Sequence, residues 1–492
     1  MHFHIPYHGY VLKQPTKMLA LYHALRDTIV DGVLLYGTKL PSSREMAGLY
    51  GISRGTVNQV YDMLASEGYL VCEVGRGTFI SFRGEEPKER DTGKKKYKLS
   101  EWGQRVSEQP RPEVMQRSTW NDADSIADFH TFKPDYDAFP QEEWNRCLHA
   151  EARKMLEDKG GEPASSQGDP ELRESIAQYL RRARGIAVGK DQVVIVNGSM
   201  QAIALTVQLL IQAGDRVIME NPGFKGIVSA VNAVNGTMQP VKVDEQGIVP
   251  GHWEAKLLFV TPSRQFPTGA VLSLDRRQQL LQWANDKEAI IVEDDYDSEF
   301  RHRGKALEPL KVLDREERVV YIGSFTKTLL PSIRIGYAVL PSSLIHPFVK
   351  AKSLYEPLPT GLLEQKTLAA FMQSGQYERH LRRMKRVYSR KFEYLLKRLH
   401  EHLSAQFDWV ESDAGLHIFG WWRGTAAQYV TFRDRCSTAG IRWSETLVKD
   451  AERNRYGAYF HFPHVTQEAM ELGVKIMKEI AEESAPILEG NV

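Results

Sequence analysis

The sequence predicts a multidomain chain with a small, mostly helical N-terminal module and a larger α/β domain that ends in a smaller α+β lobe. Residues 1–82 contain short amphipathic helical patterns followed by two alternating strand patterns. Residues 83–120 begin with a run of charged and turn-forming residues. From residue 121 onward, continuous apolar runs alternate with longer helical patterns, as in a domain built around a parallel sheet.

The composition is that of a soluble globular protein, with 42% hydrophobic and 26% charged residues among 492. The N-terminus lacks the basic start and apolar core of a signal peptide, and no apolar run approaches a membrane span, so a cytoplasmic location without membrane contact is expected. The three cysteines lie far apart with no CxxC, which predicts neither a disulfide framework nor a metal site. A net charge of +1 leaves nucleic-acid binding open, because a small basic face can belong to a neutral chain.

The N-terminal module begins with a helix whose apolar residues recur at 4-3-4 spacing: Met18, Tyr22, Leu25 and Ile29. Ser42 and Glu45 form a capping-box pattern that opens a second helix, and Ser53 is the predicted N-cap of a third. The segment LVCEVGRGTFISF then predicts two strands around a Gly-Arg-Gly turn. A helix, a helix-turn-helix and a two-stranded wing in this order indicate a DNA-binding module whose third helix enters the major groove.

The segment LPSSREMAGLYGISRGTVNQVYDMLASEGYLVCEVGRGTFIS closely resembles the winged-helix domain of GntR-type bacterial regulators. The resemblance rests on SSRE, SRGTV, EGYL and GRGTF at the expected places. It implies operator DNA binding by residues at two helix starts and at the wing: Arg44, Arg54, Thr56, Arg76 and Gly77. A helix that starts at Ser53 would also present backbone amides to a phosphate. Taken one at a time, the arginines are better explained as helix caps or surface ion pairs, and it is their combined placement at two helix starts and the wing tip that favours DNA binding.

These patterns divide the chain into a DNA-binding domain (1–82), a charged linker (83–120) and an effector domain (121–492). In the effector domain, five continuous apolar runs predict strands that are buried on both faces: VVIVNG (193–198), RVIME (216–220), KLLFVTP (256–262), AIIVEDD (289–295) and RVVYIG (318–323). They predict a largely parallel sheet with helices on both sides. From about residue 375, a long basic helical pattern followed by mixed strands and a helix predicts the smaller lobe.

The segment SFTKTLLPSIRIGY (324–337) places a lysine between hydroxyl groups and an arginine, directly after a buried apolar run. Ser324, Thr326 and Arg334 together suit a dianionic phosphate. Lys327 would become a nucleophile toward an aldehyde once its pKa is lowered. A phosphate beside a reactive amine suggests pyridoxal 5′-phosphate (PLP). An exposed lysine with solvated neighbours explains this segment alone about equally well.

Three further segments favour PLP. IIVEDDYDSEF places Asp294 at the end of a buried strand, where a carboxylate would keep the pyridine nitrogen protonated, and Tyr296 follows within reach of the ring hydroxyl. VNGSMQA predicts a helix start whose free amides suit a phosphate. ENPGFKG offers Phe224 after a tight turn, although such a ring more often serves packing.

From about residue 121 to its end, the chain resembles fold-type I PLP-dependent aminotransferases. The whole chain resembles the MocR subfamily of GntR regulators, to which a γ-aminobutyrate-responsive regulator belongs. The resemblance implies that Lys327 is the Schiff-base lysine, Asp294 the partner of the pyridine nitrogen and Tyr296 that of the ring hydroxyl. It also implies a phosphate cup and a stacking ring, formed by Ser199, Met200, Gln201, Ser324, Thr326, Arg334 and Phe224.

The resemblance further implies that Arg455 binds the carboxylate of an effector, an assignment that rests on its spacing to Phe462. One position departs from the aminotransferase pattern. Phe266 stands where that pattern has an asparagine, so a hydrogen bond to the ring hydroxyl is either missing or supplied by Arg264 or Gln265.

The sequence therefore predicts a homodimeric, PLP-dependent, DNA-binding transcriptional regulator. In it, a small amino-acid or amine effector reacts with the internal aldimine and alters operator binding. Two alternatives remain: an active aminotransferase with an accessory DNA-binding domain, and a regulator that senses PLP itself. The complete DNA-binding module favours a regulator, and Phe266 argues for partial reactions such as transaldimination in place of efficient turnover.

Overall fold

The computed structural model describes residues 3–73, 75–83, 98–109, 125–130, 132–157, 165–304, 307–449 and 454–484. The chain divides into two compact units, Met1–Lys98 and Leu99–Val492. Within these described ranges, every helix is too short or too polar to cross a membrane.

The described part of the first unit contains α1 (Tyr7–Val11), α2 (Lys17–Val30), α3 (Ser43–Tyr50), α4 (Arg54–Ser66), β1 (Leu70–Glu73) and β2 (Gly77–Ile80). The predicted capping box is present, because Ser42 Oγ accepts from the Glu45 amide while the Glu45 carboxylate accepts from the Ser42 amide. Ser53 caps α4 by accepting from the amide of Thr56. The strands β1 and β2 pair in antiparallel fashion, so the helix-turn-helix and its wing are confirmed.

The second unit is built on a large sheet with the strand order β4-β11-β10-β9-β8-β5-β6-β7. Its strands are β4 (Val193–Val196), β5 (Arg216–Asn221), β6 (Thr237–Asp244), β7 (Gly247–Ile248), β8 (Leu257–Val260), β9 (Ile290–Asp295), β10 (Val319–Ser324) and β11 (Gly336–Val339). Neighbours from β10 to β6 are parallel, whereas β11 and β7 are antiparallel to the strands they adjoin. The five predicted apolar runs all form strands of this sheet.

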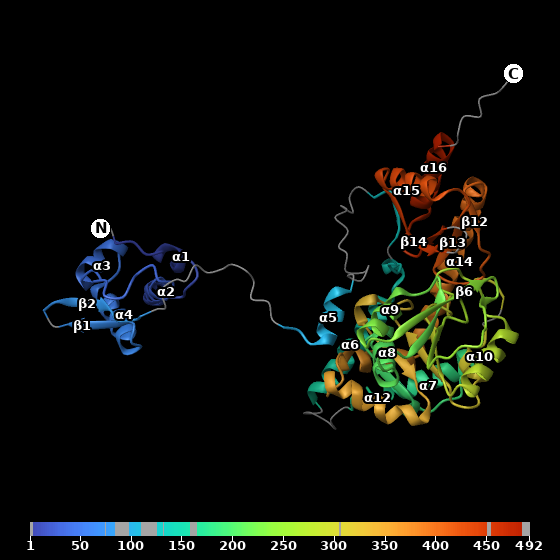
Figure 1. Cartoon of the computed structure of the whole chain (residues 1–492), viewed down its shortest axis with the longest axis horizontal. Helices are drawn as coiled ribbons and strands as arrows, with labels where there is room; N and C mark the ends of the chain where they lie inside the picture. The colour runs from blue at the N-terminus through green and yellow to red at the C-terminus, as the bar shows by residue number, and fades with distance from the viewer. Residues whose placement is uncertain are drawn as a thin grey trace, which may run out of the picture. The chain divides into compact units, whose positions relative to one another are not determined.

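Helices cover both faces of the large sheet (Figure 1). The helices before the C-terminal lobe are α6 (Gln141–Glu157), α7 (Pro170–Arg184), α8 (Ser199–Leu210), α9 (Lys225–Ala233), α10 (Leu274–Asp286), α11 (Leu310–Leu313), α12 (Ser342–Tyr355) and α13 (Leu362–Gln373). Alternate residues of β4 enter different cores: Ile195 packs with α7 and α13, and Val194 packs with α8 and α12. Strands buried on both faces explain why their sequences are continuously apolar.

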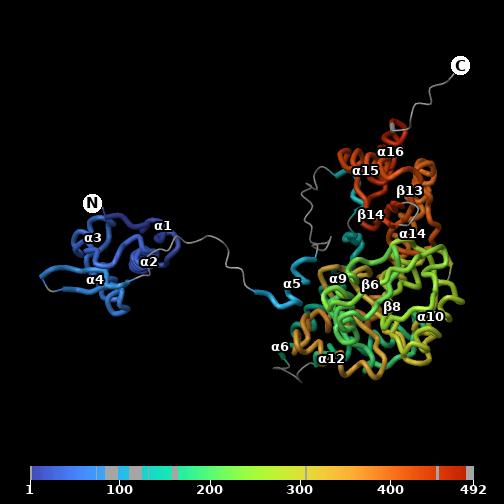
Figure 2. The backbone as a smooth tube through the Cα atoms, viewed as in Figure 1, coloured from blue at the N-terminus to red at the C-terminus, as the bar shows by residue number. Residues whose placement is uncertain are grey.

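The C-terminal lobe contains α14 (Gln376–Leu403), α15 (Ala426–Thr438) and α16 (Gln467–Ser484), and α14 packs against α16 (Figure 2). Its sheet has the order β12-β13-β15-β14-β3 and is formed by β12 (Phe407–Trp409), β13 (His417–Trp422), β14 (Ile441–Lys449), β15 (Asn454–His461) and β3 (Ala127–Phe129). The last of these strands comes from the start of the unit, so the lobe is not confined to residues after 375. The three residues of β3 carry no strand pattern of their own.

Residues 101–108 lie inside the predicted linker but form a helix, α5 (Glu101–Glu108). Ser100 caps its N-terminus. The helix binds α9 through two side chains: Arg105 Nε donates to the Ala233 carbonyl at 3.2 Å, and Gln109 Nε2 donates to the Ser229 carbonyl at 3.0 Å. Residues 84–97 and 110–120 of the predicted linker lie outside the described residues, as do residues 121–124.

Candidate functional site

Lys327 lies three residues beyond β10, at the carboxyl edge of the parallel strands. Its Nζ is 3.5 Å from the centroid of the Phe132 ring. Burial of the amine lowers the pKa of Lys327 to about 8, although the nearby Asp297 and Asp294 carboxyl groups act in the opposite direction. An amine with this pKa carries a substantial neutral, nucleophilic fraction near neutral pH.

Asp294 lies on the adjacent parallel strand, opposite Ile322 of β10. Burial, with the neighbouring Asp295 and Glu220, raises the pKa of Asp294 to about 7, although Lys327 acts in the opposite direction. A carboxyl group in this state favours a cationic partner, because an adjacent positive charge stabilises its ionised form. A protonated ring nitrogen is such a partner.

An anion cradle forms where the start of α8 meets β10 and β11. Gly198 precedes α8 with a φ of 84°, and a Cβ at this position would lie 2.5 Å from Arg334 Nη2. Arg334 itself donates to the Asn197 carbonyl at 3.1 Å. Ser324 is in register with Gly336, whose backbone lies against Gly198. The structure therefore brings the free amides at Ser199 and Met200 together with Arg334 and Ser324, which suits a phosphate.

The hydroxyl groups in this cradle are already oriented by one another. Ser324 Oγ donates to Thr326 Oγ1 at 2.9 Å and accepts from the Thr326 amide. The side chain of Gln201 is directed elsewhere: it accepts from the Asn197 amide and donates to Glu356 Oε2 at 3.1 Å. Gln201 thus holds the turn that shapes the cradle.

Glu356 was not identified from the sequence, although it supports this turn. It pairs with the buried Lys352 at 3.1 Å and also accepts from Asn197 Nδ2. Burial alone would raise the pKa of Glu356, but hydrogen bonds from Thr360 and Gln201 and the charge of Lys352 lower it to about 2.

Phe266 is the centre of an aromatic cluster that joins the large sheet to the C-terminal lobe. Its ring contacts edge-on those of Phe224, Tyr296, His417 and Tyr459, with centroid separations between 5.5 and 6.3 Å. Gly226 keeps Phe224 in place, because a Cβ there would lie 2.6 Å from that ring and 2.7 Å from Met200 Sδ. The structure therefore brings Phe224 and Tyr296 together through Phe266.

Arg264, and not Gln265, lies beside the phenol of Tyr296. Arg264 Nη1 donates to Tyr296 Oη at 2.9 Å and to Asp297 Oδ2 at 3.2 Å, and Nη2 donates to the His417 carbonyl at 2.9 Å. The amide of Gln265 donates instead to the carbonyls of Pro222 and Phe266. Of the two alternatives for a hydrogen-bond donor near the ring hydroxyl, the geometry favours Arg264.

Arg455 is not brought to the Lys327 cluster. It lies near the start of β15, where its guanidinium stacks over the Trp421 indole, 4.3 Å from the ring centroid. His461, at the other end of β15, is six residues away, or about 20 Å at 3.3–3.4 Å per residue. Tyr459 and His461 are the residues of this strand that face the cluster.

The predicted DNA contacts lie on the surface of the first unit. Arg44 and Arg54 are exposed near the starts of α3 and α4, and Arg54 Nε donates to Ser43 Oγ at 3.3 Å. The Thr56 hydroxyl is within 2.8 Å of Ser53 Oγ. Arg76, exposed at the wing turn, pairs with Glu73 at 3.0 Å.

The structure adds Lys39, which was not identified from the sequence. It bridges to Phe79 of the wing, and its side chain lies so close to Gly77 that a Cβ at Gly77 would be 2.7 Å from Lys39 Cε. A lysine held against the wing extends the basic surface available to a phosphate backbone.

Labelling of the cofactor-free chain with an amine-acylating reagent checks the state of Lys327. The rate of modification at Lys327 is expected to reach half its plateau near pH 8, more than two pH units below an ordinary lysine, because only the neutral amine reacts. Mass spectrometry of the Lys327 peptide between pH 6 and 11 measures the midpoint, with the peptide that contains Lys475 as the exposed control. A midpoint near 10.5 would contradict a desolvated amine.

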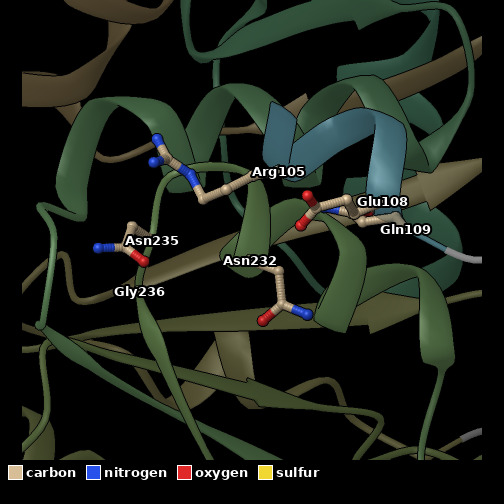
Figure 3. A pocket seen from close by; sticks show the side chains of 6 residues that line it. All are labelled: Arg105, Glu108, Gln109, Asn232, Asn235 and Gly236. Carbon is tan, nitrogen blue, oxygen red and sulfur yellow. The ribbon is translucent and has the colours of Figure 1, made fainter. Parts of the chain in front are cut away.

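A separate pocket of about 340 Å³ lies where α5 meets the end of α9. Figure 3 shows its polar lining of Arg105, Glu108, Gln109, Asn232, Asn235 and Gly236. It contains no member of the Lys327 cluster. In the described ranges, no group of three or more His, Cys, Asp or Glu side chains is arranged to hold a metal ion.

Comparison with known families places two matches on the chain. Residues 17–80 match the family described as bacterial regulatory proteins, gntR family. Residues 139–446 match the family described as aminotransferase class I and II.

Known regulators are similar over most of the chain. The probable rhizopine catabolism regulatory protein MocR of Rhizobium meliloti is 36% identical over 84% of this chain and 85% of its own length. The transcriptional regulator TauR of Rhodobacter capsulatus is 30% identical over 81% of this chain and 83% of its own length. The pyridoxine biosynthesis transcriptional regulator PdxR of Corynebacterium glutamicum is 30% identical over 76% of this chain and 77% of its own length.

Solved structures share the fold of the second unit. Kynurenine aminotransferase of Pyrococcus horikoshii superposes with a TM-score of 0.69 at 23% identity, covering 79% of this chain and 97% of that enzyme. The multiple-substrate aminotransferase of Thermococcus profundus gives 0.67 at 22% identity, covering 78% and 98%. The second unit thus has the fold of class I and II aminotransferases, which is a PLP-binding fold.

Proposed function

The chain belongs to the MocR-type regulators of the GntR family, which join a helix-turn-helix domain to an aminotransferase-like domain, and we propose that this member binds PLP and responds to a small amine by altering operator binding. The observation that carries the proposal is the convergence of Lys327, Asp294 and the Gly198–Arg334 cradle at one edge of the sheet. The reactive amine, the carboxyl group and the anion cradle match the aldehyde, ring nitrogen and phosphate of PLP.

When bound, PLP supplies an aldehyde that reacts reversibly with amines and a ring that withdraws electrons. Lys327 would hold it covalently through Nζ, and Asp294 would keep a proton on the ring nitrogen. The amides at Ser199 and Met200 with Ser324 and Arg334 would hold the phosphate. Tyr296, oriented by Arg264, would face the ring hydroxyl, and Phe224 would cover the ring.

The domain composition supports a receptor over an enzyme. Relatives that match more than three quarters of the chain are named as regulatory proteins or transcriptional regulators. Phe266 places an apolar ring where an enzyme of this fold would have a hydrogen-bonding amide, and its four aromatic contacts make it a structural junction. The site is therefore suited to bind and exchange an amine without efficient turnover.

A homodimer is the assembly that we propose for this regulator. Leu354, Tyr355 and Leu358 are 80%, 68% and 62% exposed, and they flank Glu356, which supports the cofactor cradle. A contiguous exposed apolar segment of this kind indicates a protein contact. Dimers with two-fold symmetry are the commonest homo-oligomers, and such a dimer matches the two half-sites of a palindromic operator. Light scattering of the full chain measures the assembly directly.

Arg54→Ala is expected to weaken operator binding by about tenfold or more, because an arginine at the start of a recognition helix contacts bases or phosphates. Fluorescence anisotropy with an operator duplex selected from a random pool measures the effect, and Lys13→Ala is the exposed control. A base contact would relax the sequence preference, whereas a phosphate contact would reduce the salt dependence by about one unit of slope. Unchanged affinity would place the DNA-binding face elsewhere.

The proposed function is tested with the purified full chain, prepared with and without PLP. Visible absorbance reports cofactor binding, anisotropy reports operator binding, and a panel of amines is added while keto-product formation is followed. We expect an amine to change both absorbance and operator binding without sustained product. Sustained product would favour an enzyme. A response of operator binding to PLP alone, with no effect of any amine, would favour a PLP sensor.

A further inference from the structure

One wall of the Lys327 site is the face of the C-terminal sheet that carries alternate residues of β13 and β15. Tyr459 and His461 share this face, because side chains two residues apart in a strand point the same way. His417 pairs with His461 across the strands. Phe132 joins this wall to the amine, since its ring contacts Lys327 Nζ and lies 6.0 Å from the His461 ring.

The wall is uncharged near neutral pH. Burial lowers the pKa of His417 and of His461 well below the ordinary value, and the positive charges of Arg264 and Lys327 add to this effect. The imidazole of His417 is also occupied, because Nε2 is 2.8 Å from the Pro267 carbonyl and Nδ1 is 3.3 Å from Arg264 Nη1. His461 differs, since its Nδ1 is buried without a hydrogen-bond partner while the residue is 8% exposed.

Arg264 and further basic side chains act on the imidazoles of this wall or lie beside it. Arg264 is paired with Asp297, Tyr296 and the His417 carbonyl. Burial lowers the pKa of His464, which keeps that imidazole neutral. His130, which also acts on His461, is exposed at the surface. Arg455 shares this face of β15 but lies four residues, or about 13 Å, from Tyr459, and its guanidinium stacks over Trp421.

The field at the site also disfavours an anion. Asp297 and Asp294 are the charged groups that shift the pKa of Lys327 most, and both are acidic. A carboxylate taken from water to Tyr459 and His461 would lose its hydration, and neither the paired Arg264 nor the neutral imidazoles would compensate its charge. An amine that enters as a cation is attracted by the same acidic groups.

From these observations we infer that the effector is a primary amine without a carboxylate, and that its neutral hydroxyl or aromatic body rests on Tyr459 and His461. This inference rests on the proposed function and specifies its ligand. The unpartnered Nδ1 of His461 supplies one hydrogen bond to a hydroxyl group, and the edges of Phe132 and Phe266 accommodate apolar or aromatic parts.

The test compares pairs of amines in which a carboxylate is replaced by hydrogen in one pair and by a neutral hydroxymethyl group in the other. Tyramine with tyrosine and 2-amino-1,3-propanediol with serine are titrated into the PLP-loaded full chain. Calorimetry measures binding and anisotropy measures the operator response. The carboxylate-free member of a pair is expected to bind at least about tenfold more tightly, because the other member buries an unpaired charge.

Equal or tighter binding of the amino acids would overturn the inference and leave the proposed function standing. If every member of both pairs failed to bind, the inference and the amine-sensing function would both be contradicted. These outcomes separate the failure of the ligand class from the failure of the receptor.

Variants of the wall provide a second test in the same assay. Tyr459→Arg places a guanidinium on the face next to Phe266 and is expected to shift the preference toward the carboxylate-bearing member of each pair. Leu447→Arg adds the same charge to the opposite face of β14, where the side chain is 38% exposed, and should leave the preference unchanged. His461→Leu is expected to weaken the aminopropanediol more than tyramine, and His461→Gln should restore part of that loss. Should Tyr459→Arg fail to fold, the wild-type pairs and the His461 variants still decide the inference.

Discussion

Lys327→Ala is expected to abolish covalent retention of PLP. The lysine supplies the amine at the edge of β10, and the remaining phosphate and ring contacts would hold the cofactor only reversibly. After incubation with PLP, borohydride treatment and gel filtration, mass spectrometry should find the added mass on the Lys327 peptide of the wild-type chain and none in the variant. Effector-dependent changes in operator binding should disappear with it.

The matched control is Lys225→Ala, which removes a lysine next to Phe224 at the start of α9. This variant should retain PLP on Lys327. Covalent PLP on another lysine of the Lys327→Ala chain would contradict the assignment. Operator binding without effector should survive in both variants, because the DNA-binding unit has its own core.

Arg264→Leu is expected to destabilise the second unit by about 3–5 kcal/mol, because it leaves a buried carboxylate without its ionic partner. The Arg264 and Asp297 side chains are each 2% exposed and lie 3.2 Å apart. Urea unfolding of the full chain at pH 7, followed by tryptophan fluorescence, measures the shift. Arg303→Leu, at an exposed position close in the sequence, should change stability by no more than about 0.5 kcal/mol.

The pH dependence identifies the cause of this loss. Burial raises the pKa of Asp297 above its ordinary value, and Arg264 lowers it. Without the arginine, the folded-state pKa rises further, so the folded chain binds a proton that the unfolded chain releases at the same pH. The destabilisation should therefore be smaller at pH 5 than at pH 8. A pH-independent loss would indicate packing in place of charge, and the double variant Arg264→Leu/Asp297→Leu should recover much of the stability.

Structural features that depend on residues close together in the sequence could be predicted from it. The capping box at Ser42 and the N-cap at Ser53 depend on residues three positions apart, so their patterns are local. The apolar runs predicted the parallel strands because those strands are buried on both faces. Lys327 and Arg334 could be proposed together because β10 and the turn after it place them within one short segment.

Features that depend on pairing between distant segments could not be predicted. The strand β3 is defined only by its pairing with β14, more than 300 residues later. The antiparallel β11 follows Arg334 so closely that it was interpreted as part of the lysine segment. Counting from Phe462 predicted Arg455 as the residue that binds the effector, whereas in the folded chain its guanidinium stacks over Trp421, a contact between two strands that spacing does not reveal. Phe266, His417 and Tyr459 meet only after the lobe has packed on the large sheet.

The helix α9 begins at the aromatic cluster around Phe266, and its second half binds α5, which lies within the predicted linker. Phe224 immediately precedes it, and the carbonyls of Ser229 and Ala233 bind α5. Nine residues of helix are about 14 Å long, and a hydrogen-bonded helix of that length moves as a rod. A ligand that displaces Phe224 would thus move α9, and with it the carbonyls to which Arg105 and Gln109 bind. In that case α9 alone would transmit a displacement from the aromatic cluster to α5, and the large sheet would not need to rearrange.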